Sequence, residues 1–386
     1  MKGFAARMEG SQEYYFSKKL REVNRLIQEG KPVLNLGIGS PDLSPASEVI
    51  EALKNAASNE RIHGYQSYQG LPELRAEMAS YYSKNFNVTL DPESEILPLA
   101  GSKEGIMHIS MAFLNPGDEV LIPDPGYPTY GSVTQLLGGI CSPYYLDLNQ
   151  SGRPNLEDLE SKGLDRVKLM WINYPHMPTG AQGNQAIFKE LLAFAKRHDI
   201  VLVHDNPYAH ILNPQPQSIL SLPEAKSHAM ELNSLSKTYN IPGWRIGMLC
   251  GRKDWVDAVI RVKSNQDSGM FYGLQKGAIE ALKLGPDWFD RLNEIYTKRR
   301  TLIWKLAELM DLSVQKDQAG LFVWGKVASD QNAEELVDKL LYEDQIFITP
   351  GKIFGPSGES YVRISLCQPE YKIQEAIQRI KKKSSK

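Results

Sequence analysis

The sequence predicts an α/β protein in which a large domain, built on a mostly parallel mixed sheet between helices, is followed by a smaller α+β domain. The chain has 386 residues, and at roughly 100–200 residues per domain this length favours two or three domains. From about residue 95, short apolar runs alternate with helical stretches, which is typical of a parallel sheet covered on both faces. From about residue 285 the alternation gives way to a long charged helix followed by short strands.

The expected elements follow in order along the chain. Residues 14–29 have apolar side chains at steps of three and four, which predicts a helix, and 30–32 (Gly-Lys-Pro) separate it from an apolar run at 33–36. The large sheet is expected to take its strands from 96–99, 120–122, 167–172, 200–203, 229–232 and 246–250, with helices such as 106–113 and 187–197 between them. In the smaller domain we expect a helix at 287–310 and strands at 312–314, 321–324, 346–348 and 361–364, with two helices interleaved.

These elements divide the chain into three parts. Residues 1–45 are expected to form an N-terminal segment that packs with the small domain, residues 46–285 the large domain, and residues 286–386 the C-terminal small domain. The Lys-rich end, 381–386, is expected to be a solvated tail.

The composition is that of an ordinary soluble globular protein, with 42% apolar and 23% charged residues. The formal net charge is −2, so there is no basic excess to attract nucleic acid or an anionic membrane. No run approaches the roughly 18 apolar residues of a membrane helix, and the N-terminus lacks the apolar core of a signal peptide. Three widely spaced cysteines predict reduced thiols rather than disulfides or a zinc site. We therefore expect a cytoplasmic protein with no metal site.

The strongest signal for chemistry is the segment at 234–247. It follows a strand-like run and holds one lysine, Lys237, among hydroxyl, glycine and apolar residues. Partial desolvation would favour the neutral amine, and only a neutral amine can attack a carbonyl carbon. Ser234 and Arg245 supply a hydroxyl and a guanidinium, which together suit a phosphate. From these residues alone, a solvated loop lysine remains the alternative.

The same segment resembles the lysine motif of the class I/II aminotransferases, a family of fold-type I enzymes that depend on pyridoxal phosphate. The matching pattern is S-x-S-K-x-x-x-x-x-G-x-R-x-G, and the likeness extends over nearly the whole chain in the family's order. The resemblance implies the fold of a fold-type I PLP transferase in which Lys237 carries pyridoxal 5'-phosphate as a Schiff base. It also implies that Ser234, Ser236 and Arg245 bind this cofactor.

Residues 204–208, with the sequence His-Asp-Asn-Pro-Tyr, follow another buried run. The resemblance implies that Asp205 pairs with the protonated ring nitrogen of the cofactor and that Tyr208 bonds the ring hydroxyl. A carboxylate at that nitrogen keeps it protonated, so that the ring can accept electrons from the substrate. Taken alone, Asp205 would more often be a helix N-cap or turn residue.

Two further turns resemble cofactor contacts of the family. In residues 100–105 a Gly-Ser turn opens a helix directly after a strand, and free backbone N–H groups at such a point attract phosphate. The resemblance assigns Ser102 and Lys103 to the phosphate, Lys103 through its backbone. In the rigid turn at 123–128 it assigns Tyr127 to stacking on the cofactor ring, with a surface tyrosine as the alternative.

Residues 173–180 resemble the family's N-x-P-x-N-P-T-G turn, with one departure. Asn173 matches, but Met177 stands where the family has a second asparagine that donates to the cofactor's ring oxygen. A thioether cannot donate a hydrogen bond. Tyr208 would then hold that oxygen alone or with help from Asn173, so the tuning of the cofactor should differ from that in relatives.

Substrate binding is expected to use Arg363, an arginine inside an apolar strand-like run at 361–367. Burying an arginine is costly unless it is paired, and a structural ion pair is the common outcome. The resemblance instead assigns Arg363 to the substrate α-carboxylate, which suits its planar fork. Gly39 matches the glycine whose backbone meets the same carboxylate. Both residues belong to the expected small domain, so substrate could draw that domain onto the large one.

A homodimer is expected from Tyr65, which matches the tyrosine that reaches the phosphate in the neighbouring subunit; Tyr68 competes for this role. The side-chain specificity for the amino donor stays open between aspartate-like, diaminopimelate-like and neutral amino acids. Ser268 is a candidate for a cofactor contact. Arg261 is a candidate for binding a side-chain carboxylate, and a solvated helix residue is the alternative.

The resemblance implies ping-pong transfer of an amino group from an L-amino acid to a 2-oxo acid, with Lys237, Asp205 and Tyr208 as the catalytic residues. Two alternatives remain. One is β-elimination by a C–S lyase that uses the same cofactor contacts, and the other is a non-catalytic sensor that binds the cofactor.

Overall fold

The computed structural model describes residues 3–8 and 15–384. Its centre is an eight-stranded sheet of order β2-β9-β8-β7-β6-β3-β4-β5, in which β8, β7, β6, β3 and β4 run parallel and β9 is antiparallel to both of its neighbours. The strands are β2 (Ile96–Leu99), β3 (Glu119–Asp124), β4 (Ile140–Asp147), β5 (Arg153–Pro154), β6 (Val167–Asn173), β7 (Val201–Asp205), β8 (Ala229–Ser234) and β9 (Gly247–Cys250). The predicted mostly parallel mixed sheet is therefore confirmed.

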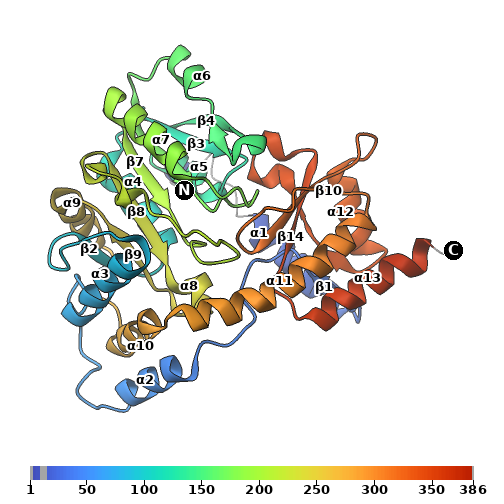
Figure 1. The fold of residues 1–386 in the computed structure, drawn as a ribbon, viewed down its shortest axis with the longest axis horizontal. Coiled ribbons are helices and arrows are strands. Elements are labelled where there is room, and N and C mark those ends of the chain that lie inside the picture. The colour runs from blue at the N-terminus through green and yellow to red at the C-terminus, as the bar shows by residue number, and fades with distance from the viewer. Residues whose placement is uncertain (1–2, 9–14, 385–386) are drawn as a thin grey trace.

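Helices cover both faces of this sheet (Figure 1). In β6, Leu169 and Trp171 belong to one buried cluster and Met170 and Ile172 to another, because successive strand side chains point to opposite faces. The first cluster includes residues of α4 (Ser102–Phe113), α5 (Pro128–Leu136) and α9 (Lys253–Lys263). The second includes residues of α3 (Pro72–Phe86), α7 (Gln185–His198) and α10 (Tyr272–Lys283). The remaining helices on this part of the chain are α2 (Ser47–Ala57), α6 (Leu156–Ser161) and α8 (Leu235–Thr238).

The long helix α11 (Pro286–Glu308) runs from beside α8 and α10 to the C-terminal part of the molecule, where it packs against α13 (Glu370–Ser384) (Figure 1). A four-stranded antiparallel sheet of order β10-β11-β14-β13 lies there, with its own buried apolar cluster. Its strands are β10 (Ser313–Val314), β11 (Phe322–Lys326), β13 (Thr349–Pro350) and β14 (Tyr361–Ser365), and α12 (Ala333–Tyr342) follows β11.

The N-terminal segment joins this C-terminal part through β1 (Leu34–Asn35), which pairs in parallel with β12 (Ile346–Phe347). Ahead of it, α1 (Tyr15–Gln28) buries Val23 and Leu26 against Leu341 and Phe347. The predicted helix is confirmed, although Ile27, one of its regularly spaced apolar residues, is 47% exposed.

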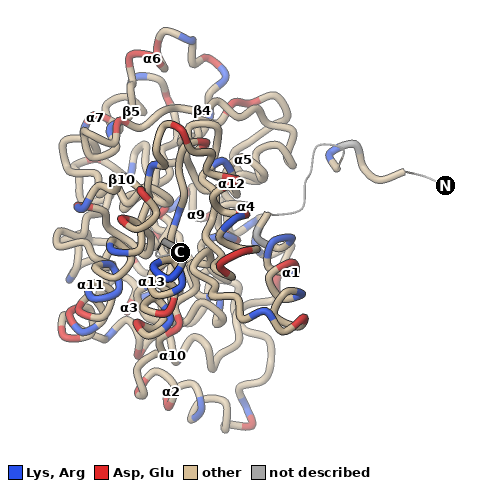
Figure 2. Tube along the Cα trace, turned by 90° about the vertical axis from the view of Figure 1, so that its right-hand side faces the viewer, with Lys and Arg blue, Asp and Glu red and all other residues tan. Residues whose placement is uncertain are grey.

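Two other expectations need correction. The edge strands β4 and β5 were not predicted, because the exposed side chains of an edge strand give no continuous apolar run. The Lys-rich end is exposed at residues 381 and 382 as predicted, but it is helical rather than frayed as far as Ser384, where α13 ends. Residues 385–386 lie outside the described residues. Figure 2 shows acidic and basic residues interspersed along the backbone trace. Among residues 3–8 and 15–384, no helix has the length and apolarity needed to cross a membrane.

Candidate active site

A cavity of about 450 Å³ lies where the carboxyl ends of the sheet strands meet the C-terminal part of the molecule. Ligands of α/β sheets bind at this edge. Apart from Tyr65 and the candidates Tyr68, Arg261 and Ser268, every residue predicted to bind cofactor or substrate lines it: Gly39, Ser102, Lys103, Tyr127, Asn173, Asp205, Tyr208, Ser234, Ser236, Lys237, Arg245 and Arg363. Residues that are more than 300 positions apart in the chain, such as Gly39 and Arg363, thus line the same cavity.

Lys237 lies on α8, the short helix that follows β8. Its Nζ donates a hydrogen bond to the Gly39 carbonyl oxygen at 2.7 Å. Burial lowers the pKa of Lys237; the Cys367 thiol opposes this, whereas the charges of Arg363 and Arg245 lower the pKa further. A lower pKa leaves more of the amine neutral at pH 7, as a nucleophile or proton acceptor requires.

Asp205 is the last residue of β7 and is only 4% exposed. Its Oδ2 accepts a hydrogen bond from the Tyr130 hydroxyl at 2.8 Å, and its backbone carbonyl accepts one from Asn173 Nδ2 at 2.7 Å. Its Oδ1 is buried and has no hydrogen-bond partner among the described residues. Burial raises the pKa of Asp205 to about 6, although the Tyr130 hydroxyl and the charge of His204 oppose the rise. Asp205 lines the cavity, and one oxygen of its carboxylate is thus open in the sense that no described group bonds it.

A cationic hollow lies at the start of α4. Gly101, with φ 89°, precedes Ser102 and Lys103 in the first turn, and a Cβ at Gly101 would overlap the Arg245 guanidinium. Burial and the charge of Arg245 lower the pKa of Lys103, and Ser236 Oγ is buried without a hydrogen-bond partner in the described part of the chain. Helix N–H groups, a guanidinium and an open hydroxyl form a site that fits a phosphate dianion.

Arg363, on β14, forms the opposite wall. Its guanidinium lies 3.8 Å from the centre of the Phe322 ring, Nη2 donates to the Gly37 carbonyl at 2.8 Å, and Nη1 lies 3.2 Å from the Met177 sulfur. The sulfur thus faces a cation rather than the solvent, in the turn where the family has asparagine. Asn173 is engaged in the same turn, because its side-chain oxygen accepts from the Met177 N–H at 2.7 Å.

The two cavity tyrosines that were predicted to bind the cofactor differ in exposure. Tyr208 is buried, burial raises its pKa, and its ring meets Phe322 edge-on at 6.1 Å. Tyr127 is half-buried just before α5. Both rings are available to contact a planar ligand in the cavity.

Several predicted candidates lie outside this cavity. Tyr65 is 93% exposed and Tyr68 is 43% exposed. Ser268 is exposed as well. Arg261 lies exposed on α9, where its Nε donates to the Asp257 carbonyl, so it does not reach the cavity of its own chain.

The sequence interpretation did not single out Tyr130, Phe322 or Phe354, which also line the cavity. Phe354 lies with its ring centre 4.7 Å from the Arg363 guanidinium, so Arg363 stands between two aromatic rings. The sequence did hold a signal for Tyr130. It lies three residues after Tyr127, and residues three apart lie on the same side of a helix.

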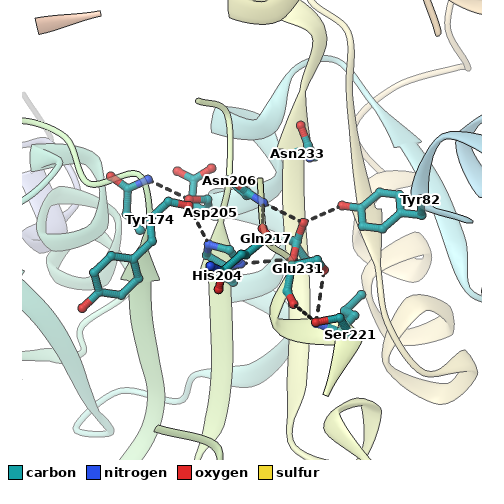
Figure 3. Close-up of polar contacts among 12 residues, drawn as sticks. Tyr82, Tyr174, His204, Asp205, Asn206, Gln217, Ser221, Glu231 and Asn233 are labelled. Atoms are coloured by element: carbon teal, nitrogen blue, oxygen red, sulfur yellow. Dashed lines mark hydrogen bonds and ion pairs between the residues drawn. The ribbon is translucent and has the colours of Figure 1, made fainter. Parts of the chain in front are cut away.

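Behind the cavity, a second carboxylate is buried in the sheet (Figure 3). Glu231, on β8, is 0% exposed. Its Oε1 accepts from the Tyr82 hydroxyl at 2.9 Å and Asn206 Nδ2 at 3.1 Å, and Oε2 from the Ser218 hydroxyl at 2.6 Å. His204 Nδ1 lies 3.0 Å from Oε2. We call these five residues the Glu231 cluster.

The protons of the cluster follow from its geometry. His204 Nε2 lies 2.9 Å from the Tyr174 carbonyl, which can only accept, so Nε2 carries a proton. One proton also lies between His204 Nδ1 and Glu231 Oε2, because two lone pairs would repel.

The cavity as a whole fits pyridoxal phosphate. Its phosphate would enter the cationic hollow at α4, its ring nitrogen would meet the open oxygen of Asp205, and its aldehyde carbon would meet the amine of Lys237. The architecture and this cavity define a fold-type I PLP-dependent enzyme.

Comparison with known proteins supports the same class. The family model for aminotransferase class I and II matches residues 31–380. The LL-diaminopimelate aminotransferase of Aquifex aeolicus is 38% identical over 98% of both chains, and that of Maridesulfovibrio salexigens is 39% identical over 96% of both. The substrate-bound BacF structure from Bacillus subtilis superposes with a TM-score of 0.95 at 32% identity, covering 99% of this chain and 98% of that one.

The chain therefore belongs to the class I and II aminotransferase family. It is a PLP-dependent transferase that moves an amino group from an L-amino acid to a 2-oxo acid.

Proposed function

We propose that this aminotransferase works as a cytoplasmic homodimer, takes LL-diaminopimelate or a similar L-amino acid as donor, and binds its cofactor covalently through Lys237. One observation carries the assignment of Lys237: a lysine of lowered pKa shares a cavity with an open carboxylate oxygen, a cationic hollow and an arginine. All three cysteines are free thiols, which is in keeping with a reducing compartment.

The cofactor, when bound, supplies an aldehyde that takes up the amine of the substrate and a ring that accepts electrons from its α-carbon. Lys237 Nζ would take the proton from the substrate α-carbon and later return a proton, a role that burial supports because it favours the neutral amine. Asp205 Oδ1 would hold the proton on the ring nitrogen. Tyr208 would bond the ring oxygen, with the remaining hydrogen of the Asn173 amide as its only help from that turn.

Binding and orientation would come from the two ends of the cavity. Ser102, Lys103, Ser234, Ser236 and Arg245 would hold the phosphate, with Tyr127 stacked on the ring.

Arg363 would bind the substrate α-carboxylate with both Nη atoms, beside the backbone of Gly39. Its present bonds to Gly37 and Met177 would then be exchanged or shared.

The homodimer proposal rests on Tyr65, whose 93% exposed side chain lies outside the cavity of its own chain. In a mixture of Lys237→Ala and Tyr65→Ala proteins, subunit exchange would create one complete site per dimer and so restore activity. If the mixture stayed inactive although mixed dimers had formed, Tyr65 would not act on the neighbouring site.

The donor proposal rests on the two LL-diaminopimelate aminotransferases that cover nearly the whole chain. A neutral, apolar donor is the second candidate, because Leu20, Ile38 and Phe354 line the cavity beside Arg363. Initial rates with LL-diaminopimelate, aspartate and phenylalanine, each with 2-oxoglutarate and with pyruvate, would separate these candidates.

The test of the Lys237 assignment is the Lys237→Ala variant. It should lose covalent attachment of the cofactor and turnover, whereas Lys226→Ala, which removes a half-buried lysine paired with Glu95, should keep both. Normal turnover in Lys237→Ala would contradict the role assigned to Lys237. Release of pyruvate from a sulfur amino acid without added 2-oxo acid would show β-elimination as well.

A further inference from the structure

Tyr130 is fixed firmly beside Asp205. It lies in the first turn of α5 and is 1% exposed. Its ring stacks on Trp171 with centres 5.0 Å apart and planes 7° apart, and Tyr127 meets it edge-on at 5.5 Å. The direction of its hydroxyl, which donates to Asp205 Oδ2 at 2.8 Å, is therefore set by packing on two sides.

This bond determines which way the Asp205 carboxyl group turns. The terminal torsion of an aspartate side chain is broad and weakly defined by itself. With Oδ2 held by Tyr130, Oδ1 is left as the buried oxygen without a hydrogen-bond partner in the described chain. The Asn173 amide fixes the backbone of the same residue, so both the main chain and the side chain of Asp205 are restrained.

We propose that Tyr130 is a positioning residue of the reaction, whose hydroxyl holds one oxygen of Asp205 so that the other stays ionised and directed at the cofactor's ring nitrogen. The proposal rests on the function proposed above for Asp205. Tyr130 itself transfers no proton and contacts no substrate atom in this role.

Electrostatics supports the same role. Burial raises the pKa of Asp205, and the Tyr130 hydroxyl is the strongest influence against that rise, ahead of the His204 charge, while the Glu231 charge adds to it. Tyr208 lies near enough for the Asp205 charge to raise its own pKa, so it does not favour the Asp205 anion. Tyr130 is thus the neighbour that most favours the ionised carboxylate.

The first experiment compares Tyr130→Phe with Tyr144→Phe. Tyr144 is also buried and donates its hydroxyl to the Trp171 carbonyl at 2.7 Å, so both variants lose one buried hydroxyl beside Trp171, but only the first touches Asp205. We expect Tyr130→Phe to weaken binding of pyridoxal phosphate by the cofactor-free enzyme about tenfold, as loss of a hydrogen bond to a charged group does. The acidic limb of its kcat/KM profile should move to higher pH. Tyr144→Phe should change neither.

The second experiment is a double-mutant cycle with Asp205→Asn, read out as cofactor affinity. The effect of Tyr130→Phe should largely disappear in the Asp205→Asn background, because the hydroxyl acts only through the carboxylate. An equal loss in both backgrounds, or equal losses in Tyr130→Phe and Tyr144→Phe, would overturn the proposal. If Asp205→Asn alone left affinity and turnover unchanged, the assigned role of Asp205 would fail first. If Asp205→Asn lowered cofactor affinity and turnover but Tyr130→Phe lowered neither, only the positioning role of Tyr130 would fail.

Discussion

Two buried carboxylates on neighbouring strands of the large sheet have opposite surroundings. Glu231 on β8 has both oxygens bonded and does not line the active-site cavity. Asp205, at the end of β7, does line that cavity, and it has one bonded oxygen and one oxygen without a hydrogen-bond partner in the described part of the chain. Burying a carboxylate is costly unless hydrogen bonds replace its hydration. Full satisfaction therefore indicates a structural role for Glu231, and the open oxygen indicates a place kept for a ligand at Asp205.

The largest expected effect is that of Asp205→Asn on activity. An asparagine keeps the size of the side chain and can accept from Tyr130, but it carries no charge to hold a proton on the cofactor ring. We expect kcat to fall about a thousandfold, the upper range for removing one electrostatic contact to developing charge, measured under saturating cofactor. A kcat within a few-fold of the wild-type value would contradict the functional role of Asp205.

The structural role of Glu231 is tested by the Glu231→Gln variant. The amide nitrogen of glutamine cannot accept from the surrounding donors, so the buried contacts of one of the two Glu231 oxygens are lost. Leaving a buried polar group without a partner costs about 2 kcal/mol of unfolding free energy, which urea denaturation would measure. Glu190→Gln, which breaks the exposed pair with Arg153, is the matched control and should change stability little. A loss no larger than that of the control would contradict the structural reading.

Much of this comparison could not have come from the sequence. The family motifs led to Lys237, Asp205 and Arg363 because each follows a recognisable strand or turn, and the fold they implied is confirmed. The Tyr130–Asp205 bond joins residues 75 positions apart and the Tyr82–Glu231 bond joins residues 149 positions apart, so no local pattern connects them. Glu231 sits in an apolar strand, where the sequence shows one acidic residue but not its donors.

A stability profile against pH sharpens the contrast further. Burial raises the pKa of Asp205 to about 6 in the folded protein, from an ordinary value of 3.8 that we take for the unfolded chain. The folded protein therefore binds this proton more tightly, and Asp205 contributes a stability penalty that is absent below pH 4 and grows as pH rises to about 6. At pH 7 cofactor-free Asp205→Asn should then be more stable than cofactor-free wild type by about 3 kcal/mol, with no difference near pH 4. A constant difference across this range would show that Asp205 does not titrate as its burial requires.

The smallest effect is expected at Met177, whose sulfur faces Arg363 rather than donating to the cofactor. In Met177→Asn the new amide can donate to the ring oxygen beside Tyr208, as the family's asparagine does, and so favour the ionised form of that oxygen. We expect the pH at which the visible absorbance of the bound cofactor titrates to fall by about one unit, the equivalent of one modest hydrogen bond. Met177→Leu, which has a similar size and no donor, should leave that pH unchanged. Because Met177 also contacts Arg363, both variants are expected to alter KM for the amino donor more than kcat. Equal shifts in Met177→Asn and Met177→Leu would mean that packing at residue 177, and not a donated hydrogen bond, sets the titration of the bound cofactor. The ring oxygen of the cofactor would then receive hydrogen bonds from Tyr208 and Asn173 alone.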